Sequence, residues 1–156
     1  IGLPLSGKDT LMSCLNFTDF YVVSRDAILA EVSQEGNYRF QYFSSDSKQI
    51  DKIYYKRMVT SAENKLNTIV NATNLTIKRR RKIILRYPDH KKIAIEMPLP
   101  SKAEFDFRNK SRSQATGKYI PMSVYDEMMA FFEPVKEKEG WDKIYSLDNH
   151  DFTIHF

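Results

Sequence analysis

The sequence predicts an α/β fold in which helices cover both faces of a parallel sheet. Short apolar runs of strand length alternate along the chain with stretches of helical periodicity, and this alternation is typical of parallel sheets. A glycine-containing loop directly precedes the first expected helix. Ligands in such folds bind beyond the carboxyl ends of the strands, so the loops that follow the strands are where we expect functional residues.

The first half of the chain is expected to alternate short strands with helices. The run FYVV has strand length, and Ile28, Leu29 and Val32 lie at helical spacing before Gly36 and Asn37 interrupt the pattern. A later stretch repeats apolar residues at every third or fourth position, which predicts a long helix. We therefore expect helices over 9–16, 26–34 and 47–66, and strands over 20–23 and 68–70.

The second half continues the alternation. The segment KIAIEM precedes Pro98 and Pro100, which predicts a strand that ends sharply. Ser101 stands three residues before Glu104, the pattern of a capping box at a helix start, and Pro121 suits the first turn of the last helix. We expect helices over 77–85, 101–113 and 121–139, and strands over 92–97 and 142–147.

Size and composition narrow the class of protein. The 156 residues suit one domain, and 42% hydrophobic with 28% charged residues is typical of a globular protein. No stretch approaches the ~20 apolar residues of a membrane span. No signal peptide is visible, so we expect a cytoplasmic protein, or one of the host-cell cytoplasm if the source is viral. The single cysteine excludes a disulfide within the chain, and the net charge of +4 suits a polyanionic partner without requiring one.

Residues 2–10, GLPLSGKDT, are close to the phosphate-binding pattern G-x-x-x-x-G-K-[ST]. Backbone N–H groups of such a loop bind phosphate oxygens, its lysine reaches the β- and γ-phosphates, and the next hydroxyl binds Mg²⁺. Asp9 departs from this pattern by replacing the hydroxyl, and Leu5 stands at a variable position where kinase P-loops usually carry glycine. The alternative is a structural turn. Nucleotide contacts are expected from Gly2, Ser6, Gly7, Lys8, Asp9 and Thr10.

The chain opens at Ile1 and runs straight into this loop. A fold rarely begins in that way, so we expect Ile1 to be the end of a first, central strand whose earlier residues precede the numbering. The whole of 1–156 would then be one phosphate-binding domain.

A carboxylate follows the FYVV strand in the sequence Ser24-Arg25-Asp26. At the end of this strand Asp26 would face the same crevice as the phosphate-binding loop, where it could accept a proton from a substrate hydroxyl. N-capping of the next helix by Asp26 explains the residue equally well and is compatible with that role.

Polar and basic residues follow the next strand. Thr73 and Asn74 would point at the nucleotide or its metal, unless Asn74 or Thr76 serves as a helix cap. The basic run 78–82 is typical of a solvated helix face, although it could serve a nucleic-acid backbone.

Arg108 and Arg112 are spaced i, i+4 and therefore share one face of a helix. A loop that contains Gly117 follows. Two guanidiniums on a closing lid, over about 101–120, would neutralise a transferring phosphate and exclude water. The alternative is surface charge paired with Glu104 or Asp106.

Taken together, these motifs resemble the polynucleotide 5′-hydroxyl kinases of the phage type and their stand-alone bacterial relatives. The order and rough spacing hold over essentially the whole chain. The resemblance implies a P-loop NTPase-like sheet with a helical lid. The matching segments are GLPLSGKDT, Arg25-Asp26, Thr73-Asn74-Leu75, Arg108-Asn109 with Arg112, and Ile120-Pro121 with Val124 and Met128.

The resemblance implies phosphoryl transfer from ATP or another nucleoside triphosphate, with Mg²⁺, to the 5′ end of DNA or RNA, as in nucleic-acid repair. Lys8 would hold the phosphates, Asp26 would be the general base, and Arg112 with Arg108 would neutralise charge. Arg25, Thr73 and Asn74 would contact the substrate. Another hydroxyl acceptor, or a pseudokinase that only binds, remains an alternative.

The departures from the family pattern concern the metal and the acceptor. The family usually has an acidic residue beside the Thr-Asn pair, where this chain has Asn71, so Asp9 could take over part of the metal's ligation. Leu29 stands where the phage-type enzyme has a basic residue that contacts the acceptor. The aromatic tract 38–43 could stack on acceptor bases instead, or could belong to the core.

Overall fold

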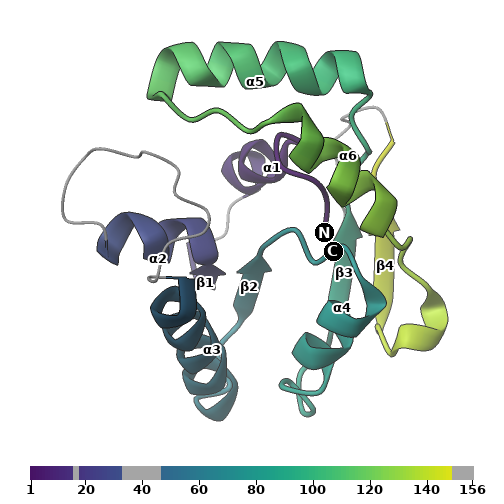
Figure 1. The fold of residues 1–156 in the computed structure, drawn as a ribbon. Coiled ribbons are helices and arrows are strands. Elements are labelled where there is room, and N and C mark those ends of the chain that lie inside the picture. Colours follow the sequence, from purple (N-terminus) through teal and green to yellow (C-terminus); the bar gives the residue numbers. More distant parts are fainter. Residues whose placement is uncertain (16–17, 33–46, 149–156) are drawn as a thin grey trace.

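The computed structural model describes residues 1–15, 18–32 and 47–148, and its elements follow the predicted order (Figure 1). The helices are α1 (Lys8–Cys14), α2 (Arg25–Val32), α3 (Ser47–Glu63), α4 (Ile77–Ile84), α5 (Lys102–Thr116) and α6 (Met122–Phe131), with a 3₁₀ turn η1 (Glu137–Glu139). The strands are β1 (Tyr21–Ser24), β2 (Thr68–Asn71), β3 (Ile93–Glu96) and β4 (Lys143–Ser146). No helix of these described ranges is long and apolar enough to cross a membrane.

The strands form two parallel pairs, β1 with β2 and β3 with β4. The first two residues hydrogen-bond toward both pairs. The backbone nitrogen of Ile1 donates to the Ile95 carbonyl at 2.8 Å, the Met97 nitrogen donates to the Ile1 carbonyl at 2.8 Å, and the Gly2 nitrogen donates to the Thr73 carbonyl at 3.0 Å. The predicted α/β fold with parallel strands is confirmed.

Separate apolar clusters fix the helices on either side of the opening loop. One joins β1 to α2 and α3 through Val23, Ile28 and Met58, all of which are buried. A second joins the loop residue Leu3 to Phe105 of α5 and Tyr125 of α6. In Figure 1, α5 therefore lies across the same end of the molecule as α1.

The last predicted helix, over 121–139, is wrong in its second half. Helix α6 ends at Phe131, Phe132 is extended, and the Glu133 nitrogen donates to the Leu75 carbonyl instead. Pro134 explains the stop, because a proline disfavours helical geometry in the residue before it and has no N–H to continue the ladder. By contrast, α5 is longer than expected, and its capping box of Ser101 and Glu104 is confirmed. The aromatic tract 38–43 lies outside the described residues.

The basic run 78–82 is not a uniformly solvated face, because Arg80 is fully buried. Its guanidinium forms an ion pair with Glu139 at 2.7 Å and donates to the carbonyls of Asn74, Leu75, Glu133 and Pro134. Burial alone would raise the pKa of Glu139, but the Arg80 hydrogen bonds and a backbone hydrogen bond from Lys136 hold that pKa below its usual value. Arg80 thus fixes α4 against η1 and the segment after α6.

Replacing Arg80 by methionine should lower the free energy of unfolding by about 3–5 kcal/mol, because it leaves the Glu139 carboxylate and several carbonyls buried without their donor. Urea denaturation measures the loss. The exposed neighbour Arg81, replaced by methionine, is the matched control and should change stability by less than about 0.5 kcal/mol. Equal effects of the two substitutions would contradict a structural role for Arg80.

Candidate active site

A cleft of about 800 Å³ lies at the carboxyl ends of β1 and β2. The loop that starts α1 lines it together with α3, the start of α2, the segment after β2, α4 and α5. All predicted site residues except Gly2 and Ser6 line this one cleft, namely Gly7, Lys8, Asp9, Thr10, Arg25, Asp26, Thr73, Asn74, Arg108 and Arg112.

Gly2 and Ser6 do not line the cleft, but their close packing constrains the path of the loop. A Cβ atom on Gly2 would stand 2.7 Å from the Met97 Cβ and 2.8 Å from the Ser6 hydroxyl, so no larger residue fits there. The Ser6 hydroxyl is buried and has no hydrogen-bond partner within the described residues. Leu5 has φ 64°, a left-handed conformation that favours glycine, which explains why glycine is usual at this position.

Lys8 is folded onto its own loop. Its ammonium donates to the carbonyls of Gly2 at 2.9 Å and Leu3 at 2.6 Å. Burial lowers the pKa of Lys8 to about 8, although the carboxylates of Asp9 and Asp26 act in the opposite direction. Because a phosphate would favour the charged ammonium, this lysine is prepared to bind an anion that enters the cleft.

Two of the departures noted in the sequence, Asp9 and Asn71, are in contact. The side-chain amide of Asn71, at the end of β2, donates to the Asp9 carboxylate at 2.9 Å. Across the described ranges, no three His, Cys, Asp or Glu residues form a metal cage. Mg²⁺ commonly needs only one or two carboxylates besides substrate phosphates, so Asp9 and the Thr10 hydroxyl beside Lys8 fit such an ion.

Asp26 is exposed at the start of α2, and it is not the cap of that helix. The Ser24 hydroxyl takes that part by accepting from the Ala27 nitrogen at 3.3 Å. Arg25 forms an ion pair with Asp51 of α3 at 2.9 Å. Within the described part of the chain the Asp26 carboxylate forms no ion pair, which leaves it available to a ligand.

The segment after β2 is tied to the opening loop by backbone contacts. The Thr73 carbonyl accepts from the Gly2 nitrogen, and the Asn74 carbonyl accepts from Arg80. Asn74 is largely buried with φ 47°, while Thr76 caps α4 by accepting from the Arg79 nitrogen. The capping alternative is thus correct for Thr76 and wrong for Asn74.

Both arginines of α5 line the cleft. Arg108 donates to the Leu5 carbonyl at 2.9 Å and also lies 3.7 Å from the Glu104 carboxylate, so the surface pair and the contact with the loop coexist. Between the arginines, the buried side chain of Asn109 donates to the Ile120 carbonyl at 2.6 Å and accepts from the Ile120 nitrogen at 3.0 Å. Asn109 thereby fixes the rotation of α5 that turns the arginines toward the cleft.

Some lining residues were not predicted from the sequence, namely Asp51, Tyr54, Tyr55 and Met58 of α3 and Ile83 of α4. Arg79 and Lys82 also line the cleft, and they belong to the basic run 78–82 that the sequence offered for a nucleic-acid backbone. In the sequence Tyr54 and Met58 belong to the apolar stripe of this helix, and only tertiary packing decides which part of that stripe lies beside a ligand. Asp51 stands one helical turn before Tyr54 and Tyr55, and its charge is a signal that could have marked this side of the helix.

Nucleotide binding should take up protons near pH 8. At pH 8 about half of the free molecules carry a neutral Lys8, and a bound triphosphate raises its pKa. Titration calorimetry with ATP in two buffers of different ionisation enthalpy should show an uptake of about half a proton at pH 8 and close to none from Lys8 at pH 6. Lys8→Arg keeps a charge that does not titrate, so the uptake at pH 8 should vanish. An unchanged uptake in Lys8→Arg would contradict this assignment.

Comparison with known proteins agrees with the geometry. No curated protein matches the chain. A family model described as an AAA domain (AAA_33), a P-loop NTPase-like domain, matches residues 1–135. The matched range contains the opening loop, the polar residues that follow β1 and β2, and the arginines of α5. The chain therefore belongs to this AAA domain family of P-loop nucleotide-binding domains.

Proposed function

We propose that the protein is an ATP-dependent kinase that phosphorylates the 5′-hydroxyl end of a polynucleotide. The observation that carries the proposal is the composition of one cleft: Lys8 in a P-loop, the carboxylate of Asp26, which forms no ion pair among the described residues, and two arginines from α5. Membership of a P-loop family supports nucleotide binding. The carboxylate and the arginines add what transfer to a hydroxyl requires.

In the proposed reaction Asp26 acts as the general base. Its carboxylate takes the proton of the attacking hydroxyl while the oxygen of that hydroxyl bonds to the γ-phosphorus and the bond to the leaving ADP oxygen breaks. Lys8 binds the β- and γ-phosphate oxygens, and Arg108 and Arg112 balance the charge that moves toward ADP. Asp9 and Thr10 would hold Mg²⁺, which supplies further charge neutralisation on the phosphates. Helix α5 with the segment to residue 120 would act as the lid.

Asp26→Asn should lower transfer of labelled phosphate from ATP to a 5′-OH oligonucleotide by about 10²–10⁴-fold, because an amide cannot take the proton. ATP binding should persist. The exposed residue Asp89, replaced by asparagine, makes the same change of charge away from the cleft and should leave activity unchanged.

Full activity of Asp26→Asn would refute its role as base. An oligonucleotide that already carries a 5′-phosphate should accept nothing. Transfer to nucleosides or modified bases, but not to oligonucleotides, would identify another acceptor. ATP binding without transfer to any hydroxyl would identify a pseudokinase.

The Asp9–Asn71 contact predicts a metal dependence. Asp9→Ala removes the carboxylate without restoring the hydroxyl that usually binds Mg²⁺ at this position, and Asn71→Ala removes the amide that orients the carboxylate. Either change should raise the Mg²⁺ concentration for half-maximal transfer by about tenfold, in line with losses of this kind around metal ligands. The same titration is run with Mn²⁺, and Asp19→Ala serves as the control. An unchanged activity and metal dependence in Asp9→Ala would eliminate Asp9 as a ligand.

A further inference from the structure

We propose that the α3–α4 side of the cleft is the binding site for the acceptor strand of the nucleic acid. In this arrangement a base packs against the tyrosines of α3, and Arg79 with Lys82 binds the adjoining backbone phosphate. The inference rests on the proposed function and names the part of the cleft that makes a polynucleotide, and not a free nucleoside, the preferred acceptor.

Asp26 fixes which side of the cleft receives the acceptor. The hydroxyl that it activates must lie beside its carboxylate, and the neighbouring Arg25 is paired with Asp51 of α3 at 2.9 Å. Tyr54 and Tyr55 follow Asp51 by one helical turn and line the same cleft. The remainder of an acceptor held at Asp26 therefore lies against α3, away from the cations of the P-loop and α5.

The α3 wall has the chemistry of a base-binding surface. Tyr55 is 39% exposed, and the buried side chains of Tyr54 and Met58 support it from behind while lining the same cleft. The Arg86 guanidinium lies 5.2 Å from the centre of the Tyr55 ring, which joins α3 to α4. Aromatic faces of this kind bind bases of any sequence by stacking.

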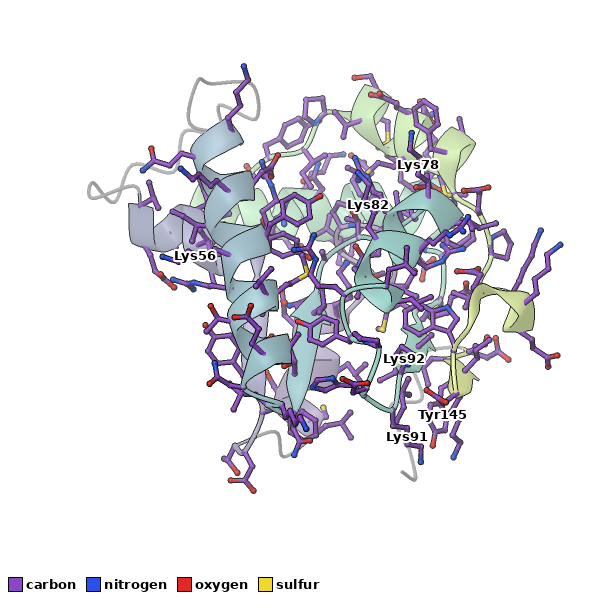
Figure 2. The ribbon with its side chains drawn as sticks, turned by 90° about the horizontal axis from the view of Figure 1, so that it is seen from below. Lys56, Lys78, Lys82, Lys91, Lys92 and Tyr145 are labelled. Atoms are coloured by element: carbon purple, nitrogen blue, oxygen red, sulfur yellow. The ribbon has the colours of Figure 1, made fainter. Side chains whose placement is uncertain are left out.

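The α4 wall supplies positive charge that forms no ion pair among the described residues. Arg79 and Lys82 are three residues apart on one face of α4, both are exposed, and both line the cleft. Across the described residues neither side chain forms an ion pair, in contrast to Arg80 between them. In Figure 2, Lys82 lies nearer to α3 than Lys78 does.

Base-binding and phosphate-binding groups therefore face each other across one cleft, next to the candidate base. A nucleoside would use only the first set, whereas a nucleotide strand would use both. Lys78 and Arg81 belong to the same helix and are also exposed, but they do not line the cleft. The helix thus contains its own matched control, with the same change of charge on other faces.

The test compares Arg79→Gln/Lys82→Gln with Lys78→Gln/Arg81→Gln in the full chain. Fluorescence anisotropy with a 5′-OH single-stranded oligonucleotide labelled at its 3′ end measures binding over a range of salt. We expect the first variant to bind at least about tenfold more weakly, and the slope of log K against log salt to shrink by about 1.4, as for two lost phosphate contacts. The control variant should change affinity less than about twofold, and ATP affinity should be unchanged in both.

Kinetics supply the second measurement. In the Arg79→Gln/Lys82→Gln variant the KM for the oligonucleotide should rise about tenfold with the KM for ATP unchanged, while transfer to a free nucleoside stays as in the unmodified protein. Equal losses in the two double variants, or an unchanged oligonucleotide affinity, would overturn the inference even if the protein is a kinase. Selective loss of binding in a protein that transfers no phosphate would uphold the inference and overturn the proposed function.

Discussion

The arrangement of the molecule depends on the hydrogen bonds that its first two residues make. Isolated two-stranded pairs are only marginally stable, and Ile1 and Gly2 bond both to β3 and to the segment after β2. The contact leaves no space for a side chain at Gly2. The hydrogen bonds of Ile1 and Gly2 place Lys8 at the same end of the strands as the polar residues that follow β1 and β2. The site is thus assembled by the same bonds that hold the strand pairs together.

Two buried polar side chains then orient the walls of the cleft. Arg80 fixes α4 through Glu139 and four carbonyls, and Asn109 fixes α5 through both backbone groups of Ile120. Each is flanked in the sequence by charged residues with other surroundings. Arg79 and Arg81 beside Arg80 are exposed, and Arg108 beside Asn109 lines the cleft. Because a buried polar group without partners is costly, these networks hold their helices in one rotation. That rotation turns the arginines of α5 and the cations of α4 toward a shared space.

The order of the elements and most of the predicted residues that line the cleft can be read from the sequence, because helical periodicity and the ends of apolar, strand-length runs are local signals. FYVV and the Gly-Lys loop predict where Asp26 and Lys8 lie without any tertiary information. Other features depend on distant partners. The burial of Arg80 depends on its ion pair with Glu139, and Arg25 pairs with Asp51 of α3, which lies 26 residues further along the chain. The end of α6 follows from Pro134, a local signal, although the apolar periodicity continues beyond it. Asp9 and Asn71 look like two separate losses in the sequence, and in the structure they form one contact.

The central claim is that this cleft moves a phosphoryl group onto a 5′-hydroxyl. The most direct measurement incubates the protein with Mg²⁺, γ-labelled ATP and a 5′-OH oligonucleotide, digests the product to mononucleotides and locates the label. The account predicts label only in the 5′-phosphate of the terminal nucleotide. Label on a base, on the protein or only in released phosphate would contradict it.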